Sequence, residues 1–82
     1  MDAWVYVLRC ADGSLYTGWT IDLERRLAAH ASGRGARYTR SRLPVELAGA
    51  LGVSDSHAAR REEARIKRLP RQQKLELIAG WR

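Results

Sequence analysis

The sequence predicts an α+β fold with one three-stranded, mainly antiparallel sheet flanked by helices. Three observations lead to this prediction. Two stretches rich in β-branched and aromatic residues are separated by Asp12-Gly13, a pair that favours a tight hairpin. Leucine then recurs at helical spacing, and a third apolar stretch is followed by two further helical segments. The expected order is therefore β-β-α-β-α-α.

The predicted elements follow one another through short connections. The hairpin strands span residues 4–10 and 15–19, and Thr20 or Asp22 caps a first helix that Gly33 ends. Residues 32–44 form a connection rich in Gly and Arg. Residues 45–53 form the third strand, and residues 54–56 cap a second helix that runs to about residue 69. The last helix spans residues 70–79, and its core-facing residues are Leu75, Ile78 and Ala79.

Length and charge limit the class of protein. With 82 residues, residues 1–82 form a single domain with a thin core. Fifteen Lys and Arg against nine Asp and Glu give a net charge of +6. Six arginines and no acid lie between Glu24 and Glu46, so a polyanionic partner such as nucleic acid is expected. The alternative is a basic surface that is merely well solvated.

Several other classes of protein are not supported. No apolar run approaches the roughly 20 residues of a membrane span, and no signal peptide is visible, so the expected location is the cytoplasm. Cys10 is the single cysteine, which excludes an intrachain disulfide and gives no support for a zinc site. We expect it to be a small buried apolar residue.

Arg26 and His30 are the first candidate site residues. They stand four apart on the predicted first helix, so they share a face and can point at one ligand. The alternative is a solvated arginine and a partly exposed histidine near the helix end. Gly18 adds a second hint, because glycine inside a strand indicates close approach by a ligand or another backbone.

These residues belong to a longer pattern. Tyr6 is followed ten residues later by Tyr16-Thr17-Gly18, and Arg26 and His30 come ten and fourteen residues after Tyr16. With the basic segment 33–39 and residues 61–69, this pattern resembles the GIY-YIG nucleases over nearly the whole chain, in particular the small stand-alone bacterial branch related to the Slx-type structure-specific endonuclease domain. Trp4 stands where the family name has glycine, and Thr17 where it has isoleucine.

The resemblance implies a mechanism and a metal. In it, Tyr16 draws a proton from the attacking water, Tyr6 or His30 positions or relays that proton, and Arg26 neutralises the phosphoryl oxygens. One Mg²⁺ or Mn²⁺ is held by a glutamate of the second helix, for which Glu63 is our choice. Glu62 stays open as the alternative, since helix geometry does not separate the two.

The arginine-rich segment is the candidate for holding the nucleic acid backbone. An unpaired base could stack on the tyrosine within it. A solvated loop is the alternative, and His57 is expected to be an ordinary surface residue. The nucleic-acid-binding candidates are Arg34, Arg37, Tyr38, Arg40 and Arg42.

The resemblance also demands one hairpin register. A two-residue turn would place Tyr6 and Tyr16 on opposite faces of the sheet. A three-residue turn with Gly13 in the left-handed region pairs Tyr6 with Gly18 and brings both phenols to one face. We therefore predict the three-residue turn, with Tyr6, Tyr16, Arg26 and a helix glutamate converging on one pocket.

Three functions remain open at this point. The first is a metal-dependent endonuclease acting on DNA, with branched or damaged DNA as a candidate substrate class, as in DNA repair. The second is a nucleic-acid-binding module that keeps the fold without cleaving. The third is a basic protein-interaction domain, which would not depend on a divalent metal.

Overall fold

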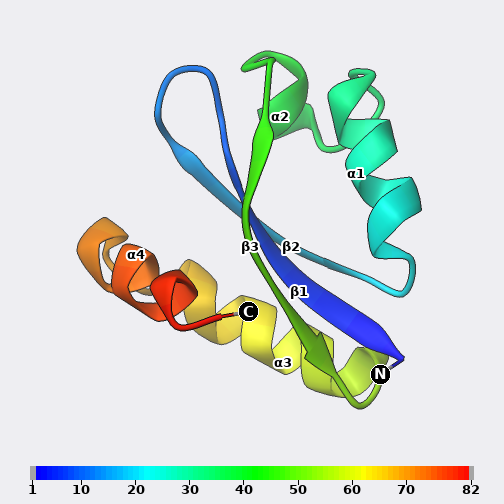
Figure 1. The fold of residues 1–82 in the computed structure, drawn as a ribbon, viewed down its shortest axis with the longest axis vertical. Coiled ribbons are helices and arrows are strands. Elements are labelled where there is room, and N and C mark those ends of the chain that lie inside the picture. Colours follow the sequence, from blue (N-terminus) through cyan, green and yellow to red (C-terminus); the bar gives the residue numbers. More distant parts are fainter. Residues whose placement is uncertain (1, 82) are drawn as a thin grey trace.

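A three-stranded antiparallel sheet forms the centre of the molecule, with helices on both faces (Figure 1). The computed structural model describes residues 2–81. The strand order is β2-β1-β3, so the first strand of the chain is the central one. The elements are β1 (Ala3–Arg9), β2 (Leu15–Thr20), α1 (Leu23–Ala31), α2 (Arg37–Arg40), β3 (Glu46–Val53), α3 (Ser56–Lys67) and α4 (Arg71–Ala79). The α+β class and the expected order of the main elements are confirmed.

The hairpin between β1 and β2 turns through three residues. The Cys10 amide donates to the Ser14 carbonyl at 2.9 Å, and the Gly13 amide donates to the Cys10 carbonyl at 2.9 Å. Gly13 has a φ of +86°, a conformation that only glycine adopts without strain. Asp12 completes the turn, because its Oδ1 accepts from the Ser14 amide at 2.9 Å. The predicted turn is confirmed.

This turn sets the register of the two strands. Tyr6 pairs with Gly18, and Leu8 pairs with Tyr16. Since side chains alternate across a strand, both phenols lie on the same face of the sheet. The predicted register is also confirmed.

The two faces of the sheet are covered by different helices. Figure 1 shows α1 and α2 on one side and α3 and α4 on the other. On the α3 side, Ala3 and Val5 pack against Ala59 and Ile66, and all four are fully buried. On the α1 side, the buried groups include Tyr6 and His30. The apolar core therefore lies on one face, and the other face is packed largely with polar aromatic groups.

Aspartates cap helices α1 and α3. Asp22 caps α1 by accepting from the Arg25 amide at 3.1 Å, and Asp55 caps α3 by accepting from the Ala58 amide at 2.8 Å. After α1, Gly33 has a φ of +81°, as expected for a residue that ends a helix. These caps hold α1 and α3 at defined starting points relative to β2 and β3.

Two details differ from the expectation. The connection over residues 32–44 contains the short helix α2, which no pattern of apolar residues predicts. In α4, Ile78 is buried as predicted, but Ala79 is exposed, and Leu77 packs against the core instead. Ile78 lies against β3, where a Cβ on Gly49 would lie 3.1 Å from the Cβ of Ile78, and Ala79, the next residue of the helix, points away from the core.

None of the helices within residues 2–81 is long and apolar enough to cross a lipid bilayer. Cys10 is buried, with 4% of its surface exposed, as expected.

Candidate active site

The hydroxyl of Tyr6 is the centre of the candidate site. It lies 2.8 Å from Nε2 of His30, and Nε of Arg26 donates to it at 3.4 Å. Arg26 and His30 therefore point at one group from the same face of α1, as their spacing predicts. Tyr6 is 1% exposed and His30 is 0% exposed. The alternative of a solvated arginine and a partly exposed histidine is excluded for His30.

Two glycines make room for the rings. A Cβ on Gly18 would lie 2.6 Å from Oη and 2.7 Å from Cζ of Tyr6. A Cβ on Gly35 would overlap the Nδ1 edge of the His30 ring. The Tyr6 phenol thus packs directly against the backbone of Gly18, and the His30 imidazole packs against that of Gly35. This contact explains why β2 contains a glycine.

Burial and charge set the protonation of this cluster. Burial raises the pKa of Tyr6, although the hydrogen bond from Arg26 opposes that change. Burial, together with the positive charge of Arg26, lowers the pKa of His30. The hydrogen bond to Tyr6 raises the pKa of Arg26. At neutral pH the resting site therefore contains a neutral phenol, a neutral imidazole and a guanidinium cation.

Tyr16 lies beside this buried pair, in a cluster of rings. Its ring centroid is 6.5 Å from that of Tyr6, 5.4 Å from that of His30 and 5.9 Å from that of Tyr38, on which it stacks. The Nζ of Lys67 in α3 lies 5.9 Å from the Tyr16 ring centroid. Because β2 is an outer strand, α3 can reach this cluster past the free edge of the sheet.

The two glutamates of α3 have different surroundings. Glu63 Oε2 lies 3.7 Å from Lys67 Nζ, and the negative charge of Glu63 is one of the influences that raise the pKa of Tyr6. Glu62 forms an ion pair with Arg65 and lines a different hollow, with Val53 and Ala58. Glu63 is therefore the glutamate on the side of the tyrosines.

A divalent ion would meet a sparse set of protein ligands here. Within residues 2–81, no three side chains of the His, Cys, Asp and Glu types gather at one place. Mg²⁺, however, is held by one or two carboxylates together with waters and substrate phosphates. The Glu63 side chain is 21% exposed, and its ion pair with Lys67 is of the weak, solvent-accessible kind. A single hard-oxygen ligand at Glu63 fits such an ion.

Two hollows lie beside the candidate residues. One of about 340 Å³ is lined by Arg26 and residues close to it. Another of about 470 Å³ is lined by Glu63 with cationic and aromatic neighbours, namely Trp19, His57, Arg60 and Arg61. Arg26 and Glu63 are therefore both reachable from solvent, although Tyr6 is not. They line separate hollows, neither of which is lined by Tyr6 or Tyr16, so the single pocket predicted for Tyr6, Tyr16, Arg26 and a helix glutamate is not observed.

The arginine-rich segment divides into two kinds of residue. Arg34, Arg37 and Arg40 are exposed. Arg42 instead pairs with Asp12 at 3.0 Å, and its guanidinium carbon lies 3.8 Å from the Tyr38 ring centroid. Tyr38 is thus in contact with Tyr16 and Arg42, and 37% of its surface stays exposed.

Sequence reasoning missed three residues that contact the site. Thr39 is fully buried, and its Oγ1 lies 2.8 Å from Nδ1 of His30. Lys67 reaches Tyr16, and Gly35 supports His30. Gly35 and Thr39 lie in the connection over residues 32–44, and Lys67 lies one turn after Glu63. No sequence periodicity at these positions predicts the contacts.

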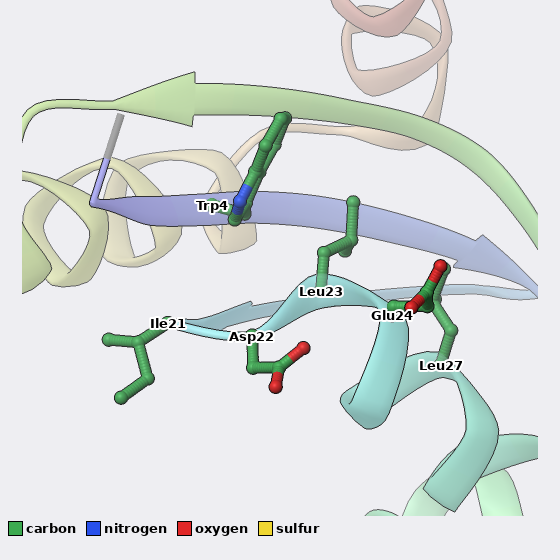
Figure 2. Close-up of a pocket in the computed structure, with 6 residues that line it drawn as sticks. All are labelled: Trp4, Ile21, Asp22, Leu23, Glu24 and Leu27. Atoms are coloured by element: carbon green, nitrogen blue, oxygen red, sulfur yellow. The ribbon is translucent and has the colours of Figure 1, made fainter.

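The largest hollow near α1 does not contain the tyrosines. Figure 2 shows Trp4 of β1 standing over the sheet beside Leu23 at the start of α1. This open hollow of about 670 Å³ is lined by apolar and acidic residues: Trp4, Ile21, Asp22, Leu23, Glu24 and Leu27. Asp22 and Glu24 make it unsuited to phosphate. This hollow is therefore no candidate for binding phosphate, and the tyrosine cluster remains the candidate site.

Replacing Gly18 with alanine should disrupt the site. The added Cβ cannot share space with the Tyr6 phenol, so the ring must move and its bond to His30 must lengthen. We expect Gly18→Ala to lower the free energy of unfolding by about 1–3 kcal/mol in urea titrations. Gly80→Ala is the control, because its Cβ would meet only the Leu77 carbonyl at an ordinary 3.5 Å. Equal stability of the two variants would contradict the close packing described here.

The buried histidine should make stability depend on pH. His30 has a lowered pKa in the folded state, so below its ordinary value of 6.5 the unfolded chain binds the extra proton first. The free energy of unfolding should therefore fall as the pH drops through 6.5, by up to about 1.4 kcal/mol per pH unit from this group. Urea titrations on both sides of pH 6.5 measure it. His30→Gln should remove this component, with His57→Gln as the control; an unchanged slope in His30→Gln would refute it.

Comparison with known proteins assigns the family. The sequence model of the family described as the GIY-YIG catalytic domain matches residues 2–76. A UPF0213 protein of Streptococcus pneumoniae serotype 4 is 52% identical over 77 residues, covering 94% of this chain and 78% of that protein. The UPF0213 protein OB0043 of Oceanobacillus iheyensis is 52% identical over 75 residues, covering 92% of this chain and 87% of that protein.

Two solved structures share the fold. The solution NMR structure of UPF0213 protein BH0048 from Bacillus halodurans has a TM-score of 0.62 at 44% identity, and that of EF2693 from E. faecalis has a TM-score of 0.65 at 40% identity. Each match covers 96% of this chain and 84% of the other chain. Several of the similar proteins carry the name UPF0213, and the chain belongs to the GIY-YIG family, a family of nucleases.

Proposed function

We propose that this protein is a metal-dependent endonuclease that hydrolyses phosphodiester bonds in DNA. The observation that carries the proposal is the hydrogen-bonded group of Arg26, Tyr6 and His30, with Tyr16 beside it on one face of the hairpin. Phosphodiester hydrolysis needs an activated water, a cation at the phosphoryl oxygens and a proton path. This group contains one candidate for each need.

The two tyrosines have different roles in this proposal. Tyr16 is partly exposed, so it can meet a water that approaches the phosphate, and it acts as the base for that water. Tyr6 is buried between Arg26 and His30, so it serves in the relay of the proton. The Nζ of Lys67 lies 5.9 Å from the Tyr16 ring centroid, so a cation stands beside this base.

Arg26 and Glu63 complete the site. Arg26 remains charged throughout, since its pKa is raised, and its guanidinium neutralises the phosphoryl oxygens. Glu63 is the residue that would hold Mg²⁺ or Mn²⁺. Its position on the tyrosine side of α3 supports this assignment. When bound, the ion supplies Lewis-acid stabilisation of the phosphoryl oxygen and of the leaving oxygen.

The substrate is proposed to run along the free edge of β2. The hollows at Arg26 and at Glu63 are both open to solvent, and exposed arginines follow α1 at positions 34, 37 and 40. Tyr38 and Arg42 support Tyr16 and the hairpin turn in this proposal, in addition to any contact with nucleic acid. Branched or damaged DNA is the proposed substrate class, in the cytoplasm and in the service of repair.

Cleavage assays with matched variants test the proposal. We expect the purified protein to cut labelled flap or branched DNA with Mg²⁺ or Mn²⁺ and not with EDTA. Tyr16→Phe and Arg26→Ala should reduce the rate by at least about 100-fold, the scale of general acid–base and electrostatic contributions. Glu63→Gln should lose activity, whereas Glu62→Gln, whose partner is Arg65, should keep it.

Each alternative function gives a different result in the same assay. Metal-independent binding without cleavage would identify a nucleic-acid-binding module. Neither binding nor cleavage would favour a basic protein-interaction domain. If Glu63→Gln keeps full activity and Glu62→Gln loses it, Glu62 is the metal ligand in place of Glu63.

The arginine-rich segment can be tested by the salt dependence of binding. If Arg37 and Arg40 each neutralise one phosphate of duplex DNA, changing either to alanine should reduce the slope of log K against log salt by about 0.9. Arg65→Ala is the control, because Arg65 pairs with Glu62 away from the tyrosines. Fluorescence anisotropy over a series of salt concentrations measures the slope. The same slope in all three variants would exclude these two arginines as phosphate ligands.

A further inference from the structure

Three buried polar side chains form a continuous chain behind the tyrosines. Tyr6 Oη lies 2.8 Å from His30 Nε2, and His30 Nδ1 lies 2.8 Å from Thr39 Oγ1. Thr39 Oγ1 in turn donates to the Ala36 carbonyl at 3.0 Å. All three side chains are at most 1% exposed, so each polar hydrogen needs an acceptor inside the protein.

The donors and acceptors can be ordered from the Arg26 end. A guanidinium only donates, so Tyr6 Oη is the acceptor of the bond from Arg26 Nε. Within residues 2–81, the remaining hydrogen-bond partner of Tyr6 Oη is His30 Nε2. The phenolic proton must therefore point to Nε2, which must carry no proton of its own.

The rest of the chain follows from this first bond. His30 is neutral in the resting site, because burial and Arg26 both lower its pKa. A neutral imidazole without a proton at Nε2 has it at Nδ1, so Nδ1 donates to Thr39 Oγ1. The Thr39 hydroxyl then donates its hydrogen bond to the Ala36 carbonyl. Every polar hydrogen in the chain has an acceptor.

The reversed arrangement leaves a buried group unsatisfied. If Thr39 donated to Nδ1, His30 would carry its proton at Nε2 and donate to Tyr6. Tyr6 Oη would then accept from both Arg26 and His30, and its own proton would have no acceptor inside the described part of the chain. Leaving a buried donor unpaired is unfavourable, so the first arrangement is preferred.

We propose that Thr39 is a positioning residue that fixes the Nδ1–H tautomer of His30 and so directs the Tyr6 proton toward the imidazole. Thr39 does not touch the reacting atoms. It acts through His30, whose ring is also confined by Gly35. The short helix α2 brings Thr39 to this place, which gives that helix a function in the site.

The tautomer gives the relay a direction, and this consequence rests on the proposed function. When Tyr6 gives up its proton, the O–H bond breaks and an N–H bond forms at His30 Nε2. The phenolate then faces Arg26, and the imidazolium still donates from Nδ1 to Thr39. Tyr6 can next accept a proton from the water side of the site. Protons thus travel from the reaction side through Tyr6 to His30.

Nitrogen NMR of the histidine ring tests the tautomer without DNA or metal. In the ¹⁵N-labelled protein, His30 should show a protonated Nδ1 and an unprotonated Nε2. Thr39→Ser keeps the hydroxyl and should keep this pattern. Thr39→Val has the same shape without an acceptor and should shift His30 toward the Nε2–H form. Thr39→Cys, a much weaker acceptor, serves if the valine variant does not fold.

The results separate this inference from the nuclease proposal. A protonated Nε2 in the unmodified protein would overturn the tautomer assignment, and an unchanged tautomer in Thr39→Val or Thr39→Cys would overturn the positioning role of Thr39, whatever the activity. If the protein cuts DNA, Thr39→Val should reduce the rate by about 10- to 100-fold and Thr39→Ser should restore it. If it does not cut DNA, the proposed function fails, and the tautomer result stands by itself.

Discussion

The pairing of Tyr6 with Gly18 is the constraint on which the rest of the site depends. It follows from a turn of three residues, in which Gly13 takes up a left-handed conformation. The missing side chain at Gly18 then leaves the space that the phenol fills. Only in that position does Tyr6 reach both Arg26 and His30 of α1. The local geometry of one turn thus determines a network between distant parts of the chain.

The site residues also serve as the packing of their face of the sheet. On the α3 side, burial is aliphatic, as in most small domains. On the α1 side, the fully buried groups include Tyr6, His30 and Thr39, which satisfy one another by hydrogen bonds. A thin domain of this kind has few other contacts with which to hold α1 and α2 against the sheet. Stability and the arrangement of the site are therefore coupled on this face.

Much of the architecture could be predicted from the sequence, because it depends on local rules. The hairpin itself was predicted from Asp12-Gly13, but its register came from the family resemblance, which requires both phenols on one face. The start of α1 was predicted at Thr20 or Asp22 and that of α3 within residues 54–56, and in the structure Asp22 and Asp55 are the caps. The convergence of Arg26 and His30 followed from the i, i+4 spacing of a helix.

The remaining features depend on contacts that have no local pattern. Helix α2 is four residues long and is held by tertiary contacts, so it looked like part of a loop. The role of Arg42 depends on Asp12, which lies thirty residues earlier. Thr39 was not a candidate, since a threonine between arginines is typical of a surface segment. The way α4 docks depends on the contact of Ile78 with Gly49 of β3, which helical periodicity alone does not encode.

The three-residue turn has a consequence for how this sequence can change. Because side chains alternate in a strand, inserting or deleting one residue between Cys10 and Ser14 would move every residue of β2 to the opposite face. Tyr16 would enter the aliphatic core and Trp19 would leave it. The length of this turn is therefore as much a part of the site as any side chain in it, although none of its residues contacts Tyr6, Arg26 or His30 by a hydrogen bond. Related chains that keep the two tyrosines should tolerate changes of residue type in the turn more readily than changes of its length.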